Sequence, residues 1–534
     1  MLTTGKIVSF GKPKPPPIRL ARQKPYLCRM GIRSLLAKPL AAAIAKSQNR
    51  WANAPVESQD AVFRSLIRDA KDTVFGREHG FASIRTYADF KRQVPIRDYE
   101  DLKPYIQQII GGQRDVLWPG QPIYFAKTSG TTSGVKYIPI TQKSIPNHIN
   151  SARNALLTYV HETGKAAFLD KKLIFLSGSP VLDTKGSVPT GRLSGIVNHH
   201  VPGYLRTNQL PSYATNCLED WETKLDRIID ETLTADMSLI SGIPPWVQMY
   251  FDRITARTGK KIGEVFPNFS LFVYGGVNFE PYRAKIYESI GRKIDSIELF
   301  PASEGFFAYQ DKQIHEGLLL LLNSGIFYEF IPADEFFSEN PTRLSIAEVE
   351  LGKNYAMVIN SNAGLWGYSL GDTVKFVSKN PYRLVVSGRI KHFISAFGEH
   401  VIGEEVERAM QYAMQQHPET ELIEFTVAPM VAPPDGGLPY HEWLVEFAVP
   451  PQNPSAFAAA LDQKLAKLNV YYDDLIAGNI LQPLKITPLQ RDAFRSYMKS
   501  QGKLGGQNKV PRLANDRKLA DELNGFRIGQ QHTL

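Results

Sequence analysis

The sequence predicts an α/β fold with a large N-terminal domain of parallel-rich sheets flanked by helices, followed by a small C-terminal α+β domain. Three observations support this prediction. At 534 residues the chain is too long for a single hydrophobic core. Between residues 173 and 304, short apolar strands alternate with amphipathic helices, as in parallel sheets. After Arg389 a few strands and helices occur in mixed order, which is typical of a small α+β unit.

The helices are predicted from apolar residues that recur at helical spacing, such as Val62, Leu66 and Ala70. Prolines and small polar residues set their expected ends. The predicted helices are 32–48, 58–75, 87–94, 99–110, 146–163, 221–234, 245–258, 281–290 and 454–468.

The strands are predicted from short apolar or β-branched runs that end in Gly, Ser or Pro. Since ligands of parallel sheets bind beyond the carboxyl ends of the strands, the Gly, Ser and Glu residues found there are candidates for binding. The predicted strands are 122–126, 135–141, 173–176, 237–240, 271–274, 296–300, 347–350, 356–359, 373–377, 424–428 and 443–448.

Composition excludes several classes of protein. A hydrophobic content of 43% and a charged content of 22% are ordinary for a globular protein, and no apolar run reaches 18 residues. Two cysteines cannot build a disulfide framework and fit a reducing compartment. The net charge of +9 comes from residues 1–50, which hold eleven Lys or Arg and no acid. The other 484 residues carry 51 basic and 53 acidic side chains, which does not indicate a nucleic-acid surface.

Residues 1–30 are predicted to be a basic, Pro-rich, disordered segment. Three interpretations are open: an organelle transit peptide, a basic tail for nucleic acid or membrane, or an upstream start codon with Met30 as the real initiator. The prolines between Pro13 and Pro17 make a poor amphipathic presequence, which favours a disordered or mis-started segment. Residues 31–388 are then the large domain and 389–534 the small one.

Residues 125–137, Phe-Ala-Lys-Thr-Ser-Gly-Thr-Thr-Ser-Gly-Val-Lys-Tyr, form a Gly-rich loop between two predicted strands. Glycine N–H groups and hydroxyls can surround an anion, and Lys136 adds a positive charge, so a phosphate is the expected ligand. The stretch is not the standard P-loop, because Val135 separates the second Gly from the Lys and a strand follows. The alternative is a solvent-exposed hairpin loop rich in Ser and Thr.

Three further stretches suggest a nucleotide site. Gly275-Gly276 ends a strand and permits close approach of a flat ligand. Phe300 offers an aromatic face four residues before Glu304, a carboxylate that can hold Mg²⁺ beside phosphates. Asp372 follows a glycine and can accept ribose hydroxyls, and Arg389 can contact a second ribose oxygen or a phosphate. Taken singly, a Glu after a strand is usually a surface residue and Gly-Asp is most often a turn.

Together, in order and spacing, these stretches resemble the adenylate-forming superfamily of acyl-CoA ligases, luciferases and peptide-synthetase adenylation domains. That superfamily has a Thr-Ser-Gly-Thr-Thr-Gly loop, an aromatic-x-x-x-Glu segment, a Tyr-x-x-Gly-Asp turn and a hinge of the form Gly-Arg-x-x-x-x-Ile-x-x-x-Gly. Residues 388–401, Gly-Arg-Ile-Lys-His-Phe-Ile-Ser-Ala-Phe-Gly-Glu-His-Val, resemble this hinge. The resemblance implies a mobile small domain that turns near residues 388–391.

Within the superfamily the chain resembles the Gretchen Hagen acyl-acid amido synthetases, first known from auxin-responsive plants, and a bacterial-type member is expected. The resemblance covers roughly residues 58–515. Two motifs depart from the family, with Phe300-Pro301-Ala302 for Tyr-Ala-Ser and Ser369 for an arginine. The stretches that carry the resemblance are 75–81 (Phe-Gly-Arg-Glu-His-Gly-Phe), 220–225 (Asp-Trp-Glu-Thr-Lys-Leu), 325–332 (Gly-Ile-Phe-Tyr-Glu-Phe-Ile-Pro) and 507–512 (Gln-Asn-Lys-Val-Pro-Arg).

The resemblance implies roles for individual residues. The catalytic residues would be Lys136, Glu304 and Lys509, with Glu304 as the Mg²⁺ ligand; a basic surface loop is the alternative for Lys509. The residues implied to bind ATP are Ser129, Gly130, Thr131, Thr132 and Ser133 at the phosphates, Gly275, Gly276 and Phe300 at the adenine, Ser303 near the α-phosphate, and Asp372 and Arg389 at the ribose.

The implied function is an ATP- and Mg²⁺-dependent acyl-acid amido synthetase. It adenylates a carboxylic acid, releases pyrophosphate, and transfers the acyl group to an amino acid with release of AMP. Only small-molecule partners are expected, with no nucleic acid or membrane, in a cytoplasmic monomer. One alternative is an acyl-CoA ligase of the same superfamily, and another is a non-catalytic nucleotide-binding protein.

Other kinds of site find little support in the sequence. No His-Glu-x-x-His or Cys-x-x-Cys is present, so a zinc site is not expected, and no Gly-x-Ser-x-Gly suggests a hydrolase. Residues 191–217 are candidates for an acyl pocket from their position between sheet units. The side chains considered there are Arg192, Tyr204, Tyr213 and Asn216.

Overall fold

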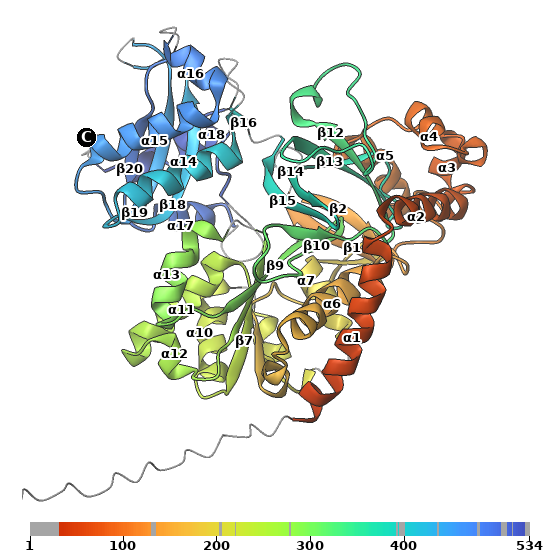
Figure 1. Cartoon of the computed structure of the whole chain (residues 1–534), viewed down its shortest axis with the longest axis horizontal. Coiled ribbons are helices and arrows are strands. Elements are labelled where there is room, and N and C mark those ends of the chain that lie inside the picture. Colours follow the sequence, from red (N-terminus) through yellow and green to blue (C-terminus); the bar gives the residue numbers. More distant parts are fainter. Residues whose placement is uncertain are drawn as a thin grey trace, which may run out of the picture.

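The structure, a computed structural model, has a larger N-terminal domain and a smaller C-terminal domain (Figure 1). Within the described ranges, no helix combines the length and the apolar character needed to cross a membrane. The described residues are 31–129, 135–201, 206–218, 220–276, 279–390, 393–394, 401–434, 437–477, 481–502, 510–514 and 516–528.

Helices dominate residues 31–110. They are α1 (Ile32–Ala52), α2 (Pro55–Ala70), α3 (Val74–Glu78), α4 (Tyr87–Gln93) and α5 (Tyr99–Ile110), with the 3-10 turn η1 (Phe81–Ser83). Capping boxes at Thr86 and Asp98 begin α4 and α5. The helix predicted at 58–75 is divided in two, because the Thr73 hydroxyl accepts the Gly76 N–H at 2.9 Å and starts a new helix.

A four-stranded sheet in the order β2-β1-β5-β4 holds the Gly-rich loop. Its strands are β1 (Tyr124–Ser129), β2 (Val135–Ile140), β4 (Asp183–Lys185) and β5 (Val188–Gly191). Since β1 and β2 pair antiparallel, the loop connects a β-hairpin, and both predicted strands are confirmed. On its other side β1 pairs with β5 in parallel.

An eleven-stranded sheet forms the centre of the large domain, in the order β12-β13-β14-β15-β11-β10-β9-β8-β7-β3-β6. One half is parallel, as the alternating pattern predicts: β3 (Lys172–Phe175), β6 (Gln209–Leu210), β7 (Met237–Ser241), β8 (Leu271–Gly275) and β9 (Asp295–Ala302). The helices of this part are α6 (Ile145–Thr163), α7 (Leu193–His199), α9 (Tyr213–Asn216), α10 (Trp221–Thr232), α11 (Pro244–Thr258), α12 (Ile262–Val265) and α13 (Glu280–Ile290), with η2 (Ala167–Asp170).

The other half of the sheet is antiparallel. It contains β10 (Gly305–Tyr309), β11 (Leu318–Leu320), β12 (Ile326–Pro332), β13 (Asn354–Ser361), β14 (Tyr368–Lys379) and β15 (Tyr382–Arg389), with η3 (Ala333–Glu335). The prediction of a strand at residues 347–350 is wrong. A turn forms there instead, in which a Glu348 carboxylate oxygen accepts from the N–H and the hydroxyl of Ser345, both at 2.7 Å.

The small domain is a mixed α+β unit, as predicted. Its three-stranded sheet has the order β18-β19-β20, with one antiparallel and one parallel pair. Trp443, Phe457 and Leu461 are fully buried between this sheet and its helices. The elements are β16 (Phe393–Ile394), β17 (Val401–Ile402), α14 (Gly403–Gln416), β18 (Glu421–Met430), β19 (Tyr440–Val449), α15 (Pro454–Leu468), α16 (Val470–Ala477), β20 (Lys485–Leu489), α17 (Ala493–Ser500), α18 (Lys518–Glu522) and η4 (Asn524–Phe526).

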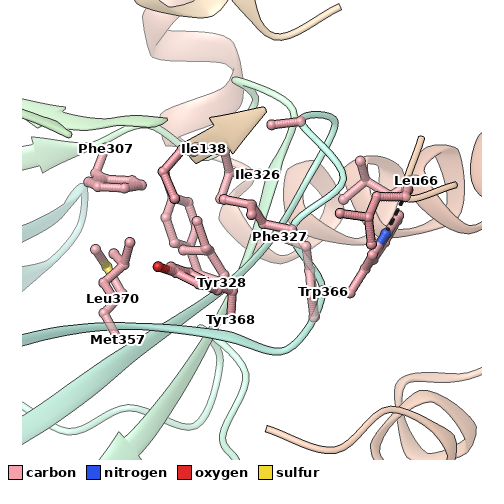
Figure 2. Close-up of a cluster of buried hydrophobic side chains, with 14 of the residues drawn as sticks. Leu66, Ile138, Phe307, Ile326, Phe327, Tyr328, Met357, Trp366, Tyr368 and Leu370 are labelled. Carbon is pink, nitrogen blue, oxygen red and sulfur yellow. Dashed lines mark hydrogen bonds between the residues drawn. The ribbon is translucent and has the colours of Figure 1, made fainter. Parts of the chain in front are cut away.

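A cluster of buried aromatic side chains joins the N-terminal helices to the antiparallel half of the large sheet. Figure 2 shows Phe307, Tyr328, Trp366 and Tyr368 of this cluster. The Trp366 indole N–H donates to the Leu117 carbonyl at 2.9 Å, so its polar atom is satisfied inside the core. This core fixes β10 and β14, which carry residues of the candidate site.

Candidate active site

The carboxyl ends of the parallel strands meet at one large cavity of about 2650 Å³. Ser241 ends β7, Gly275 ends β8 and Ala302 ends β9, and all three line the cavity. Because neighbouring parallel strands end at the same edge of a sheet, the fold brings these residues together from distant parts of the sequence.

The hairpin of β1 and β2 supplies a second part of the cavity wall. In this hairpin Thr128 lies opposite Lys136 and Ser129 opposite Val135, and both Thr128 and Lys136 line the cavity. The Lys136 ammonium also lies 5.6 Å from the centre of the Tyr99 ring. The loop residues predicted to bind phosphate, Gly130, Thr131, Thr132 and Ser133, lie outside the described residues.

Ser303 and Glu304 form the two-residue turn between β9 and β10. Ala302 pairs with Gly305 across this turn, so the strand continues beyond its predicted end at Phe300. Ser303 is buried and Glu304 is half-buried, and both line the cavity. A tight hairpin therefore holds the carboxylate at the cavity wall.

Tyr368, at the start of β14, positions this carboxylate. Its hydroxyl donates to a Glu304 carboxylate oxygen at 3.4 Å, and the ring is fully buried in the cluster of Figure 2. Burial, and then the charge of Glu304, raise the pKa of Tyr368 well above its usual value, so the hydroxyl keeps its proton. This contact was not predicted from the sequence; the available signal was the Tyr itself, because the hydroxyl of a buried Tyr usually needs a hydrogen-bond partner.

Asp372 and Arg389 are direct neighbours across β14 and β15. Glycines precede both, with a φ of +77° at Gly371 and +152° at Gly388, values that L side chains rarely adopt. Asp372 is half-buried and lines the cavity together with Gly388. For Arg389 the structure describes the backbone alone.

The residues predicted to frame an adenine lie at the ends of β8 and β9. A Cβ atom on Gly275 would come within 2.4 Å of the Leu299 carbonyl oxygen, so the parallel strands leave no room for a side chain. Gly276 has a φ of +82°. Phe300 packs edge to face against Phe307 and is 7% exposed, so the core covers most of its ring and a small part faces the cavity.

The small domain lines the cavity from the opposite side, with Gly403 and Glu404 of α14 among its lining residues. Lys375 of β14 donates to both carboxylate oxygens of Glu404 at 2.9 Å. Tyr282 of α13 donates to Glu424 of β18 at 3.2 Å. These contacts hold the small domain against the large one. Lys509, predicted to be catalytic, lies outside the described residues.

The residues that line the cavity include part of the predicted acyl pocket and the predicted Mg²⁺ ligand. Of the acyl-pocket candidates, Arg192 is a lining residue, whereas Tyr213 and Asn216 are not, and Tyr204 lies outside the described residues. In the part of the chain that the structure describes, no cluster of three or more His, Cys, Asp or Glu could hold a metal ion. A single carboxylate such as that of Glu304 is enough to fit a Mg²⁺ ion that arrives with a nucleotide, because Mg²⁺ is usually bound through one or two carboxylates plus phosphates.

Comparisons with known proteins identify the family. The models of the GH3 family N-terminal domain, central domain and C-terminal domain match residues 45–201, 319–389 and 404–518, which together are well over half of the chain. Indole-3-acetic acid-amido synthetase GH3.3 of Arabidopsis thaliana is 25% identical, over 86% of this chain and 89% of its own length. Jasmonoyl--L-amino acid synthetase GH3.5 of Oryza sativa subsp. japonica is 23% identical, over 85% and 94%.

Solved structures show the same fold. The GH3.15 acyl acid amido synthetase aligns with a TM-score of 0.76 at 16% identity, covering 91% of this chain and 96% of that one. A 2-hydroxyisobutyryl-CoA ligase aligns with a TM-score of 0.55 at 14% identity, covering 88% and 92%. The expected bacterial type is not borne out, since these curated relatives are plant proteins. By its family models and its fold, the chain belongs to the GH3 family, the Gretchen Hagen amido synthetases that its motifs resemble.

Proposed function

We propose that this chain is an ATP-dependent acyl-acid amido synthetase that joins a carboxylic acid to the amine of an amino acid. One observation carries the proposal: a single cavity is lined by Lys136, Glu304, Asp372 and the glycines at the end of β8, the positions that match the motifs of adenylate-forming enzymes. Membership of the GH3 family supports an amino acid as the acceptor.

The nucleotide is proposed to lie along the ends of β8 and β9. Gly275, Gly276 and the exposed edge of Phe300 take the adenine, because glycines allow close approach. Asp372 accepts the ribose hydroxyls, and Arg389, its neighbour across the strands, assists. The phosphates extend from Ser303 toward Lys136, where Ser129, Gly130, Thr131, Thr132 and Ser133 donate to the β- and γ-phosphates.

The proposed chemistry activates a poor acyl donor. A carboxylate cannot expel oxide, but attack of its oxygen on the α-phosphorus of ATP breaks the bond to pyrophosphate and forms an acyl adenylate, whose leaving group is AMP. Negative charge accumulates in this displacement, and Lys136 and the loop donors stabilise it. A Mg²⁺ ion bound to Glu304 would neutralise phosphate charge. The amine then attacks the acyl carbon, AMP leaves, and the amine loses a proton.

The small domain is proposed to turn between the two steps. The proposed boundary lies between residues 388 and 389, at the end of β15, with residues 31–388 as the large domain and 389–534 as the small one. Residues 1–30 are proposed to be a separate basic segment. Closure of the small domain keeps water from the adenylate, and Lys509 is proposed to assist adenylation. We further propose a cytoplasmic monomer, supported by the low cysteine content and by a cavity that one chain encloses.

Two assays test the proposal. Exchange of labelled pyrophosphate into ATP that depends on an added acid reports adenylation, and a panel of acids measures it. Amino acids and CoA are then offered as acceptors, and AMP release with the conjugate is followed by mass spectrometry. AMP release with CoA alone would replace the proposal by an acyl-CoA ligase. ATP binding without exchange across a broad acid panel would indicate a non-catalytic nucleotide-binding protein.

A further inference from the structure

Arg192 is a cavity-lining cation without a counter-ion in the described part of the chain. It follows β5 directly and lines the cavity next to Ser177 and Ser194. Its aliphatic part packs at the end of β3, where a Cβ atom on Gly178 would lie 2.9 Å from the Arg192 Cδ. Among the described residues the guanidinium makes no hydrogen bond or ion pair, and burial lowers the pKa of Arg192 without an opposing carboxylate.

Lys224 of α10 adds a second positive charge behind this position. Its side chain is buried, and its ammonium donates to the carbonyl oxygens of Ser177 at 2.9 Å and Asn216 at 2.7 Å. Both acceptors are neutral. Burial lowers the pKa of Lys224 to about 8, and the nearby charge of Arg192 acts in the same direction. Two cations thus lie close together without a carboxylate paired to either in the described residues.

Two further polar atoms near these cations have no hydrogen-bond partner in the described part of the chain. The Ser177 hydroxyl and the Asn216 side-chain oxygen are buried without a hydrogen bond among the described residues. Partly or fully buried cations without counter-ions, and buried polar atoms without hydrogen bonds, are unfavourable, because removing such groups from water costs free energy that nothing offsets. An arrangement of this kind at a cavity wall is best explained by an anionic ligand that completes it.

The position along the sheet argues against the carboxylate that is adenylated. β3 is three strands away from β9, by way of β7 and β8, and adjacent strands lie about 4.8 Å apart, so the end of β3 is displaced sideways from β9, the strand that leads to Ser303 and Glu304, by roughly 14 Å. The carboxylate that is adenylated must lie within about 3.5 Å of the α-phosphate. Since the Arg192 side chain packs against Gly178 as far as Cδ, we place its guanidinium on the β3 side of the cavity rather than at that carboxylate.

We propose that Arg192 binds a substrate carboxylate other than the one that is adenylated, and that Lys224 is a positioning residue behind it. This inference rests on the proposed function. Two substrates can bring such a group: a second carboxylate at the far end of the acyl acid, or the α-carboxylate of the amino acid. Either group keeps its charge throughout the reaction, so the contact persists from binding to product.

The test compares wild-type protein with Arg192→Gln and Arg192→Lys in two assays. The first measures pyrophosphate exchange with mono- and dicarboxylic acids of equal chain length. The second measures conjugation of amino acids and of their carboxamides. Wild-type protein should prefer either the dicarboxylic acid over the monocarboxylic acid or the amino acid over its carboxamide. In Arg192→Gln this preference should fall at least about tenfold through KM with little change in kcat, and Arg192→Lys should restore part of it.

Arg253→Gln is the matched control, because Arg253 also lines the cavity but already has Asp226 as a partner at 2.7 Å. It should leave both preferences unchanged. If Arg192→Gln loses only the preference for dicarboxylic acids, the acyl acid is the source of the carboxylate. If it loses only the preference for amino acids over their carboxamides, the acceptor is the source. Unchanged preferences in Arg192→Gln, or a rise in KM for ATP alone, would overturn the inference. Absence of exchange in wild type would instead overturn the proposed function.

Discussion

Replacing Gly275 by Ala should disrupt the nucleotide end of the site more than it destabilises the fold. The new Cβ atom would lie 2.4 Å from the Leu299 carbonyl oxygen, and contacts below 3.0 Å do not occur in practice. β8 and β9 must therefore separate by at least about 0.6 Å, which displaces the turn that carries Ser303 and Glu304. Overpacking of this kind costs about 1–3 kcal/mol. A displacement approaching 1 Å at a reacting group can cost about 100-fold in rate.

The assays are acid-dependent pyrophosphate exchange and urea unfolding. Gly275→Ala should lower the exchange rate by about 10- to 100-fold while the protein stays folded at 25 °C. Gly242→Ala is the control at the end of the next strand, β7. Its Cβ atom would lie 3.1 Å from Leu176 Cβ and from a Val247 methyl group, contacts that a shift of a few tenths of an ångström relieves. Equal exchange rates in the two variants would refute the reasoning that strand separation at Gly275 displaces the turn.

Three further predictions concern single side chains. Glu304→Ala should abolish pyrophosphate exchange without changing the circular dichroism spectrum, and unchanged exchange would remove its proposed Mg²⁺ role. Arg343→Ala should lower the free energy of unfolding in urea by about 3–5 kcal/mol, because it leaves Glu329, fully buried and 2.7 Å away, without its ion pair. Burial lowers the pKa of His148 from 6.5 to about 4. Between these two pH values the folded protein binds fewer protons than the unfolded chain, so it loses stability as the pH falls. Between pH 7 and pH 5 wild type should lose about 2 kcal/mol more than His148→Gln, and equal losses would contradict this.

The sequence predicted those elements whose periodicity or composition is local. The strands that became β7 and β8 are short apolar runs with clear ends, and their lengths match closely. β12 was not predicted as a strand, because all seven of its residues are buried and no alternation marks it. The prediction of a strand at 347–350 was wrong because the Glu348 side chain accepts a hydrogen bond from the Ser345 backbone and stabilises a turn. Residue propensities for strands do not include such contacts.

For the site, the sequence indicated residue types but not their pairing. Asp372 and Arg389 were each singled out, yet only the register of β14 and β15 shows that they are cross-strand neighbours. The contact of Tyr368 with Glu304 joins residues 64 positions apart and depends on the packing of two hairpins. Arg192 and Lys224 lie without a paired carboxylate among the described residues, and this depends on which side chains the fold brings near them, which no local pattern in the sequence can express.

Strand β14 connects the proposed nucleotide contacts to the orientation of the small domain. Tyr368 near its start holds Glu304, Asp372 lies four residues later, and Lys375 pairs with Glu404 of the small domain. Arg389, the partner of Asp372, is the last residue of β15, where the chain leaves the large sheet. A rotation of the small domain about the end of β15 must therefore disturb the pairing of β14 with β15, which is proposed to hold the ribose. We expect nucleotide binding and domain orientation to be thermodynamically linked, so that each biases the other by the same free energy.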